Sequence, residues 1–333
     1  MPQATASSAF VNTVLGPVPA HELGVVAVHE ALLSVLPGAE YAFDISFDRA
    51  QIFALLADQL RDFRSCGGGA IVDATGMFHG RSLAMYEALS RATDVHIVAS
   101  TGMGPEELLG GYFLTPQTNP PTPWPADKFA DLFAKEVTEG MVVPRLERRQ
   151  AAGVVVTAAA AEGMTPTEES LFRAAARTAI ATGIPASIRF GKDALHDLDI
   201  VLDEGVSADR VVVSGLDRAD AVAAGAALAI ARRGAYVALD HVGTNDDDTF
   251  VTDQRRAALV IDLVAAGLGD RVLLSSSATG VAKGHPANLV PYSFVLSSFV
   301  PYLRSHGVAE AAISQILIDN PRELLTVRAT DRG

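Results

Sequence analysis

Residues 210–217, RVVVSGLD, and residues 271–278, RVLLSSSA, each pass from an apolar run to a polar tail. Runs of this kind recur at 23–29, 70–75, 95–101, 153–157, 184–190, 210–214, 235–240 and 272–277, with helical patterns between them. Near-continuous apolar character is typical of parallel strands buried on both faces. Eight alternations of strand and helix predict an α/β fold of the (β/α)8 type, a TIM barrel. A doubly wound open sheet has the same alternation and stays as the alternative.

Helix signals between the runs support this alternation. Thr165, Pro166 and Glu168 predict a capping box with proline at the first helical position. Asp217 is expected to cap a helix that runs to Arg233. Barrels of this size form one unit, so we expect residues 1–333 to be a single domain, with residues 1–22 as an N-terminal extension.

Two connections are longer than the rest, residues 30–49 and residues 102–125. The second is rich in proline and contains Trp124, the only tryptophan of the chain. Long loops at the C-terminal face of a barrel commonly shape the substrate mouth. We therefore expect both loops there, with Trp124 in contact with substrate; insertions without a binding role are the alternative.

Composition narrows the function classes. The net charge of −13 argues against nucleic acid and against anionic membrane surfaces as partners. Cys66 is the only cysteine, which rules out an intramolecular disulfide and fits a reducing, cytoplasmic location. Neither a signal-peptide pattern nor an apolar run of membrane-spanning length is found in the sequence.

Several segments resemble one family in order and spacing. They are VNTVLGPVPAHELGVVAVHEAL at 11–32, TGIPASIRF at 182–190, RVVVSGLDR at 210–218, RGAYVALDHVG at 233–243 and GVAEAAISQILIDNPRELL at 307–325. Together they resemble the phosphotriesterase-like family of the amidohydrolase superfamily. The resemblance implies a metal-dependent-hydrolase barrel with paired metal ions at the strand ends, and it implies a homodimer.

The ligands that the resemblance implies are almost all replaced. His29 remains, and other residues stand at the five further ligand positions: Ala31, Val156, Arg189, Gly215 and Ser277. One imidazole falls short of the three or four protein ligands of a catalytic zinc site. A guanidinium about 4 Å away would repel a divalent ion by several kcal/mol, even at an effective dielectric of about 20. We therefore expect no binuclear centre and no cofactor; a single metal at His29 is the alternative.

Four residues are candidates for catalysis: His29, Arg189, Ser277 and Asp240. His29 suits a general acid or base, or is an inherited core histidine. Arg189 suits a carboxylate or phosphate anchor, or forms a salt bridge to Asp73 or Asp240.

Other residues at the strand ends are expected to bind substrate: Asp73, Thr75, Thr101, Thr157, Ser214, Ser275, His241 and Trp124. The serine run 275–277 invites a catalytic triad, but no Gly-x-Ser-x-Gly elbow is present, and serines that fill the space of a lost aspartate are the simpler interpretation. Lys283 and His285 follow the eighth strand, where barrels often bind phosphate, yet without a glycine-rich cradle.

Three functions fit this pattern. The first is a metal-independent hydrolase of an ester, lactone or amide, or a lyase or isomerase, that acts on a small anionic molecule. The second is a catalytically inactive binding protein, and the third is a mononuclear metal hydrolase. The replacement of a ligand by Arg189 rather than by a small residue favours the first.

Overall fold

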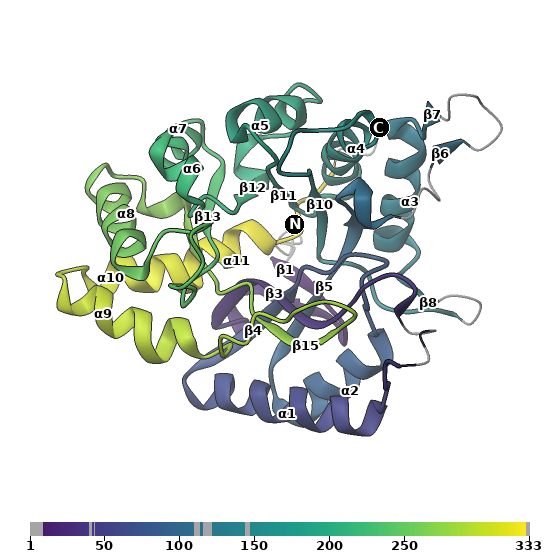
Figure 1. Cartoon of the computed structure of the whole chain (residues 1–333), viewed down its shortest axis with the longest axis horizontal. Helices are drawn as coiled ribbons and strands as arrows, with labels where there is room; N and C mark the ends of the chain where they lie inside the picture. The colour runs from purple at the N-terminus through teal and green to yellow at the C-terminus, as the bar shows by residue number, and fades with distance from the viewer. Residues whose placement is uncertain are drawn as a thin grey trace, which may run out of the picture.

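The wall of the molecule is a barrel of eight parallel strands (Figure 1). In chain order they are β3 (Val25–Val35), β4 (Gly68–Asp73), β5 (His96–Met103), β10 (Val154–Ala158), β11 (Ala186–Arg189), β12 (Val211–Ser214), β13 (Tyr236–Leu239) and β14 (Val272–Leu274). The computed structural model describes residues 9–39, 42, 44–109, 114–115, 122–143 and 147–330. Each strand overlaps one predicted apolar run, so the TIM-barrel prediction is confirmed.

The barrel closes where the eighth strand meets the first. After β14 the chain continues into β15 (Thr279–Lys283), which pairs in parallel with β3. Between β14 and β15, the Glu30 carboxylate accepts hydrogen bonds from Ser275 Oγ at 2.7 Å, Ser276 N at 3.0 Å and Ala278 N at 2.5 Å. This side chain satisfies backbone donors that a regular ladder would otherwise pair. Closure excludes the open-sheet alternative.

Helices cover the outside of the barrel (Figure 1). They are α1 (Arg49–Ser65), α2 (Leu83–Thr93), α3 (Ala126–Thr138), α4 (Pro166–Thr182), α5 (Ala194–Leu202), α6 (Ala219–Ala223), α7 (Ala226–Arg232), α8 (Asp253–Ala265), α9 (Val300–Ser305), α10 (Glu310–Ser314) and α11 (Asn320–Leu325), with π-helical turns at Val295–Phe299 and Gln315–Asp319. The Thr165 capping box with Glu168 forms as predicted. Asp217 caps no helix: α6 begins after Arg218, and Gly225, with φ +67, separates α6 from α7.

The segment before the barrel forms a hairpin of β1 (Phe10–Thr13) and β2 (Gly16–Pro19), followed by a 3₁₀ turn at Ala20–Glu22. Further 3₁₀ turns lie at Glu106–Leu108, Ala208–Arg210 and Gly269–Arg271. Short strand pairs are β6 (Leu114–Thr115) with β7 (Thr122–Pro123), and β8 (Val142–Val143) with β9 (Glu147–Arg148).

The two predicted mouth loops differ from their expected bounds. β3 does not end at His29 but runs to Val35, because β15 supplies it with a neighbour beyond the barrel rim. The first loop therefore starts after Val35 rather than at residue 30. The second, 102–125, contains the β6–β7 pair, and its segments 110–113 and 116–121 lie outside the described residues.

The inside of the barrel is filled by side chains at the end that faces α11. Apolar side chains from six strands meet there and pack against Leu324 and Leu325 of α11: Val28, Val72, Val154, Val156, Val212, Ala238 and Leu273. A ligand can therefore enter only from the C-terminal ends of the strands, as in other barrels of this type.

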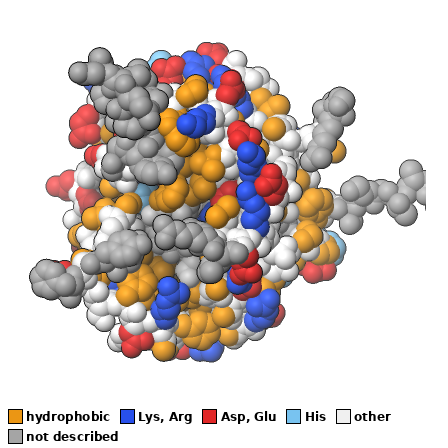
Figure 2. Space-filling model, turned by 90° about the vertical axis from the view of Figure 1, so that its right-hand side faces the viewer, with side chains coloured by type: hydrophobic (Ala, Val, Ile, Leu, Met, Phe, Trp, Pro, Cys, Tyr) orange, Lys and Arg blue, Asp and Glu red, His pale blue; other side chains and the backbone are white. Residues whose placement is uncertain are grey.

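The outer surface carries mixed charges. On the face seen in Figure 2, Lys and Arg side chains alternate with Asp and Glu and form no continuous basic patch. The pairs Arg177–Asp127 and Arg177–Glu204 join α3 and α4 to the end of α5 in this manner. None of the described helices combines the length and the apolar character that a membrane span requires.

Candidate functional site

A cavity of about 430 Å³ opens at the C-terminal ends of the strands. Seven residues predicted for catalysis or binding line it: His29, Thr75, Thr157, Arg189, Asp240, His241 and Ser277. The sequence also placed five others in the site, and these are not among the described lining residues: Asp73, Thr101, Ser214, Ser275 and Trp124. The cavity thus gathers all four residues proposed for catalysis.

Four of the residues outside the lining are buried in the wall. Asp73 accepts hydrogen bonds from Leu32 N at 2.8 Å and from Tyr86 Oη at 3.0 Å, and burial raises its pKa. Thr101 and Ser214 are fully buried. Ser275 is buried as well and donates to Glu30. Asp73, Ser214 and Ser275 bond to neighbouring strands, and alternation along the strands turns such side chains away from the cavity.

Trp124 lies at the edge of the barrel rather than at the cavity. Its ring centroid is 5.5 Å from that of Phe129, and Lys128 Nζ lies 3.5 Å from the indole centroid. Trp124 is therefore placed to pack a loop against α3, and the expected contact with substrate is not supported by its position.

Arg189 ends β11 at the mouth of the cavity. Within the described part of the chain its guanidinium forms no hydrogen bond or ion pair, and the alternative salt bridge to Asp73 or Asp240 is absent. The side chain is accessible from the mouth yet surrounded by protein, and this desolvation lowers its pKa against the opposing effect of Asp240. A guanidinium whose donors have no partner among the described residues is suited to bind an anionic ligand.

His29 stands at the inner end of the cavity. Its Nδ1 lies 3.6 Å from Asp240 Oδ2, and its backbone N–H donates to Ser275 Oγ at 2.9 Å. Burial lowers the pKa of His29, so the imidazole is neutral at pH 7. A neutral imidazole beside a carboxylate has the properties of a general base.

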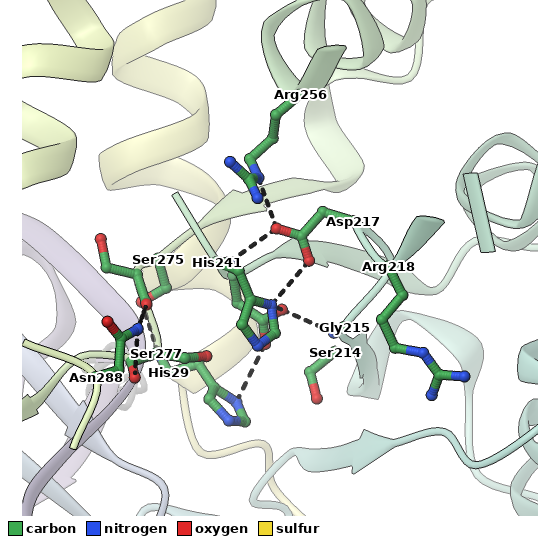
Figure 3. Close-up of polar contacts among 12 residues, drawn as sticks. His29, Ser214, Gly215, Asp217, Arg218, His241, Arg256, Ser275, Ser277 and Asn288 are labelled. Atoms are coloured by element: carbon green, nitrogen blue, oxygen red, sulfur yellow. Dashed lines mark hydrogen bonds and ion pairs between the residues drawn. The ribbon is translucent and has the colours of Figure 1, made fainter. Parts of the chain in front are cut away.

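His241 is the centre of a buried ionic network (Figure 3). Its Nδ1 lies 2.9 Å from Asp217 Oδ1 and 3.3 Å from Asp240 Oδ1, and its ring stacks on Phe250 at 3.6 Å between centroids. Burial lowers the pKa of His241, but Asp240 and Asp217 outweigh burial and raise the pKa to about 9. His241 is therefore a second cation in the cavity wall.

Arg256 supports this network from behind. The side chain is fully buried on α8, and its Nε donates to Asp217 Oδ2 at 2.7 Å while its Nη1 pairs with Asp253. Asp217 was expected to cap a helix, and no role was predicted for Arg256. No sequence pattern near either residue predicts this contact, because it joins the end of β12 to a helix that follows β13.

The residues present do not fit the binuclear centre that the resemblance implies. Ala31, Val156 and Gly215 have no ligating side chain, and Arg189 places a cation among them. Asp217, Asp240 and His241 bring one ligand atom each within 4.8 Å of one another. The His241 imidazolium and the Arg256 guanidinium form ion pairs with these carboxylates. The cluster is therefore better described as a buried ion-pair network than as a metal site.

The raised pKa values predict that stability falls as pH increases. Burial raises the pKa of Glu30 from 4.5 to about 7 against the opposing effect of its three hydrogen-bond donors. The pKa of His241 is raised from 6.5 to about 9. Both groups hold a proton more tightly in the folded state than in the unfolded state. The contribution of Glu30 to the free energy of unfolding is therefore complete below pH 4.5 and is lost as the pH rises through about 7. The contribution of His241 to the free energy of unfolding is complete below pH 6.5 and is lost as the pH rises through about 9.

Thermal unfolding between pH 5 and pH 9.5 measures this effect. We expect the unfolding temperature to decline between pH 6.5 and pH 9.5, where the opposite contribution from the lowered His29 pKa is already complete, with Glu30 and His241 each contributing on the order of 3 kcal/mol when fully titrated. Glu30→Gln should flatten the lower half of the curve and His241→Asn the upper half. A wild-type unfolding temperature that rises over this range would contradict both assignments.

The chain matches known proteins along most of its length. Residues 9–325 match the model of the Phosphotriesterase family. The phosphotriesterase homology protein of Mycobacterium tuberculosis is 26% identical over 327 residues, which cover 94% of this chain and 97% of the relative. The N-acetyltaurine hydrolase of Tetraodon nigroviridis is 24% identical, with coverage of 96% and 99%. The solved structure of a Deinococcus radiodurans phosphotriesterase-like lactonase variant superposes with a TM-score of 0.81 at 25% identity, with coverage of 95% and 99%.

Proposed function

Because this chain belongs to the phosphotriesterase family, we propose that it is a hydrolase of a small anionic ester, lactone or amide that works without a binuclear metal centre. The observation that carries the proposal is Arg189, which lines the cavity in place of a metal ligand and has no ion pair or hydrogen bond with any residue that the structure describes. A substrate carboxylate is the partner that this group lacks.

The charges of the cavity support an anionic substrate. Arg189 and His241 are both cationic at pH 7 and line the same cavity, whereas the chain as a whole carries −13. Because His241 is paired with Asp217 and Asp240, and Asp240 and Glu30 also line the cavity, Arg189 carries the attraction for an anion. That attraction is stronger in a partly desolvated cavity than in water. N-acetyltaurine, the substrate that one relative's name gives, is an amide with a sulfonate group, and so combines a cleavable bond with an anion.

His29 and Asp240 supply the acid–base chemistry. Neutral His29 accepts a proton from a water molecule that attacks the substrate carbonyl, and Asp240 Oδ2, 3.6 Å from Nδ1, stabilises the imidazolium that results. The same proton is then donated to the leaving alkoxide or amine. Arg189 holds the substrate anion, so that the carbonyl stays within reach of the base.

A matched panel of substrates tests this proposal. The nitrophenyl monoester of succinic acid carries a free carboxylate, and nitrophenyl pentanoate is a neutral ester of similar size. We expect turnover of the first to exceed that of the second and to persist in excess EDTA. Lactones with and without a carboxylate form a second pair. Failure of every carboxylate-bearing member to be hydrolysed would contradict the proposal, and saturable binding without turnover would identify an inactive binding protein.

A further inference from the structure

A serine and a histidine meet at the rim of the cavity, away from His29. β3 continues past the barrel to Val35, and in its pairing with β15 Ser34 lies opposite Ala282. His285 follows β15, and its Nε2 lies 2.8 Å from Ser34 Oγ. Both side chains line the cavity.

The direction of this hydrogen bond follows from the second ring nitrogen. His285 Nδ1 lies 2.7 Å from the Pro286 carbonyl oxygen, which can only accept. Nδ1 therefore carries the proton of the neutral ring, and Nε2 is the acceptor. Ser34 Oγ–H consequently donates to Nε2. This is the arrangement of a nucleophilic serine and its base, with a backbone carbonyl in the place of the orienting carboxylate.

The backbone holds this pair in position. Val35 N donates to the His79 carbonyl at 2.9 Å, and Leu36 N donates to the Lys283 carbonyl at 2.9 Å. These bonds fix the chain immediately after Ser34 to both of its neighbours. A rigid backbone at this point keeps the hydroxyl directed at His285, which is what a preorganised nucleophile requires.

We propose that Ser34 is the nucleophile and His285 the general base of a second reactive centre in this cavity, one that takes activated acyl or phosphoryl esters. Five residues of extended strand, at roughly 3.3 Å each, place His29 about 16 Å from Ser34 along β3. His29 is therefore not the base for Ser34, and this centre does not depend on the hydrolysis proposed above.

The reaction balances with water as the second reactant. Ser34 Oγ attacks the carbonyl carbon while its proton passes to His285 Nε2, which gives a tetrahedral oxyanion. The C–O bond to the leaving group breaks, and His285 returns the proton to the departing alkoxide, which leaves an ester on Ser34. Water then attacks this ester and transfers a proton to His285, and Ser34 Oγ recovers it as the acid is released.

A fluorophosphonate probe tests this assignment, because it forms a stable phosphonyl ester with an activated serine and releases fluoride. We expect one adduct per chain, located on Ser34 by peptide mass. Ser34→Ala should remove the label, and His285→Gln should slow labelling by about 100-fold or more, the usual loss when a general base is removed. Labelling should persist in Arg189→Met and in His29→Gln, which separates this centre from the proposed hydrolysis.

The chain offers a matched control. Ser305 Oγ lies 3.1 Å from His306 Nδ1, but its hydroxyl donates to the Tyr302 carbonyl at 2.7 Å rather than to the imidazole. Ser305→Ala should leave labelling unchanged. As a second measurement, Ser34→Cys should react with iodoacetamide at a rate that falls when His285 is also replaced by Gln. Absence of an adduct in the folded wild type, an adduct that survives Ser34→Ala, or alkylation insensitive to His285 would overturn the proposal.

Discussion

Replacing Arg189 by methionine is expected to lower kcat/KM for carboxylate-bearing esters and lactones by on the order of 100-fold, and to leave the neutral analogues nearly unchanged. The loss corresponds to about 3 kcal/mol, the contribution of charge-assisted hydrogen bonds in a partly desolvated site. Lysine should restore only part of the activity, since its ammonium lacks the planar fork that binds both carboxylate oxygens.

The structure also predicts what this substitution should not change. Arg189 has no ion pair among the described residues, so Arg189→Met should leave the unfolding temperature near that of the wild type. Arg304→Met, which removes an exposed guanidinium paired with Glu310, is the matched control and should not affect kcat/KM. Equal losses for charged and neutral substrates would mean that Arg189 does not bind the substrate anion.

Replacing Arg256 by methionine is expected to destabilise the fold by about 3–5 kcal/mol. The guanidinium is fully buried, and its removal leaves the buried Asp217 carboxylate without the Nε donor at 2.7 Å. A buried charge that loses its partner keeps its desolvation penalty without the compensating attraction. Chemical denaturation, compared with the wild type at the same pH, measures the change.

A second variant tests the charge of Asp217 without changing the packing around it. Asp217→Asn removes the anion but keeps its shape, and it should lower the pKa of His241, which rises beside two carboxylates. NMR titration of the His241 ring reports this pKa directly. Arg304→Met again serves as control, because an exposed ion pair contributes only about 0–1 kcal/mol. An Arg256→Met protein as stable as the Arg304→Met protein would contradict a structural role for the network.

The eight strands and the position of the cavity were predictable because both follow from local patterns. Strands buried on two faces must be apolar along their length, and the carboxyl ends of parallel strands converge on one face. Arg189 and Asp240 stand at those ends, and His29 lies within the longer β3 beside Asp240, so their proximity followed from the fold. Thr101 and Ser214 were misplaced because alternation decides which side a residue faces, and a one-residue uncertainty at a strand end reverses it.

The residues that the sequence did not reveal depend on contacts between distant segments. Ser34 falls within the loop predicted for residues 30–49. In the structure the pairing of β15 with β3 makes it part of a strand, opposite the segment that leads to His285. In the sequence Arg256 is indistinguishable from an exposed arginine on a helix, because its partner Asp217 is reached only through the packing of α8. No local spacing encodes either pair, since 251 residues separate Ser34 from His285 and 39 separate Arg256 from Asp217.

We propose that a guanidinium and a carboxylate–imidazole network govern this cavity in the place of divalent ions. Elemental analysis by mass spectrometry of protein purified without chelator, in parallel with its hydrolytic activity, tests it most directly. We predict far less than one zinc, manganese, iron or cobalt ion per chain in fully active material. One or two such ions per chain, lost together with activity on chelation and restored together with it, would contradict the claim.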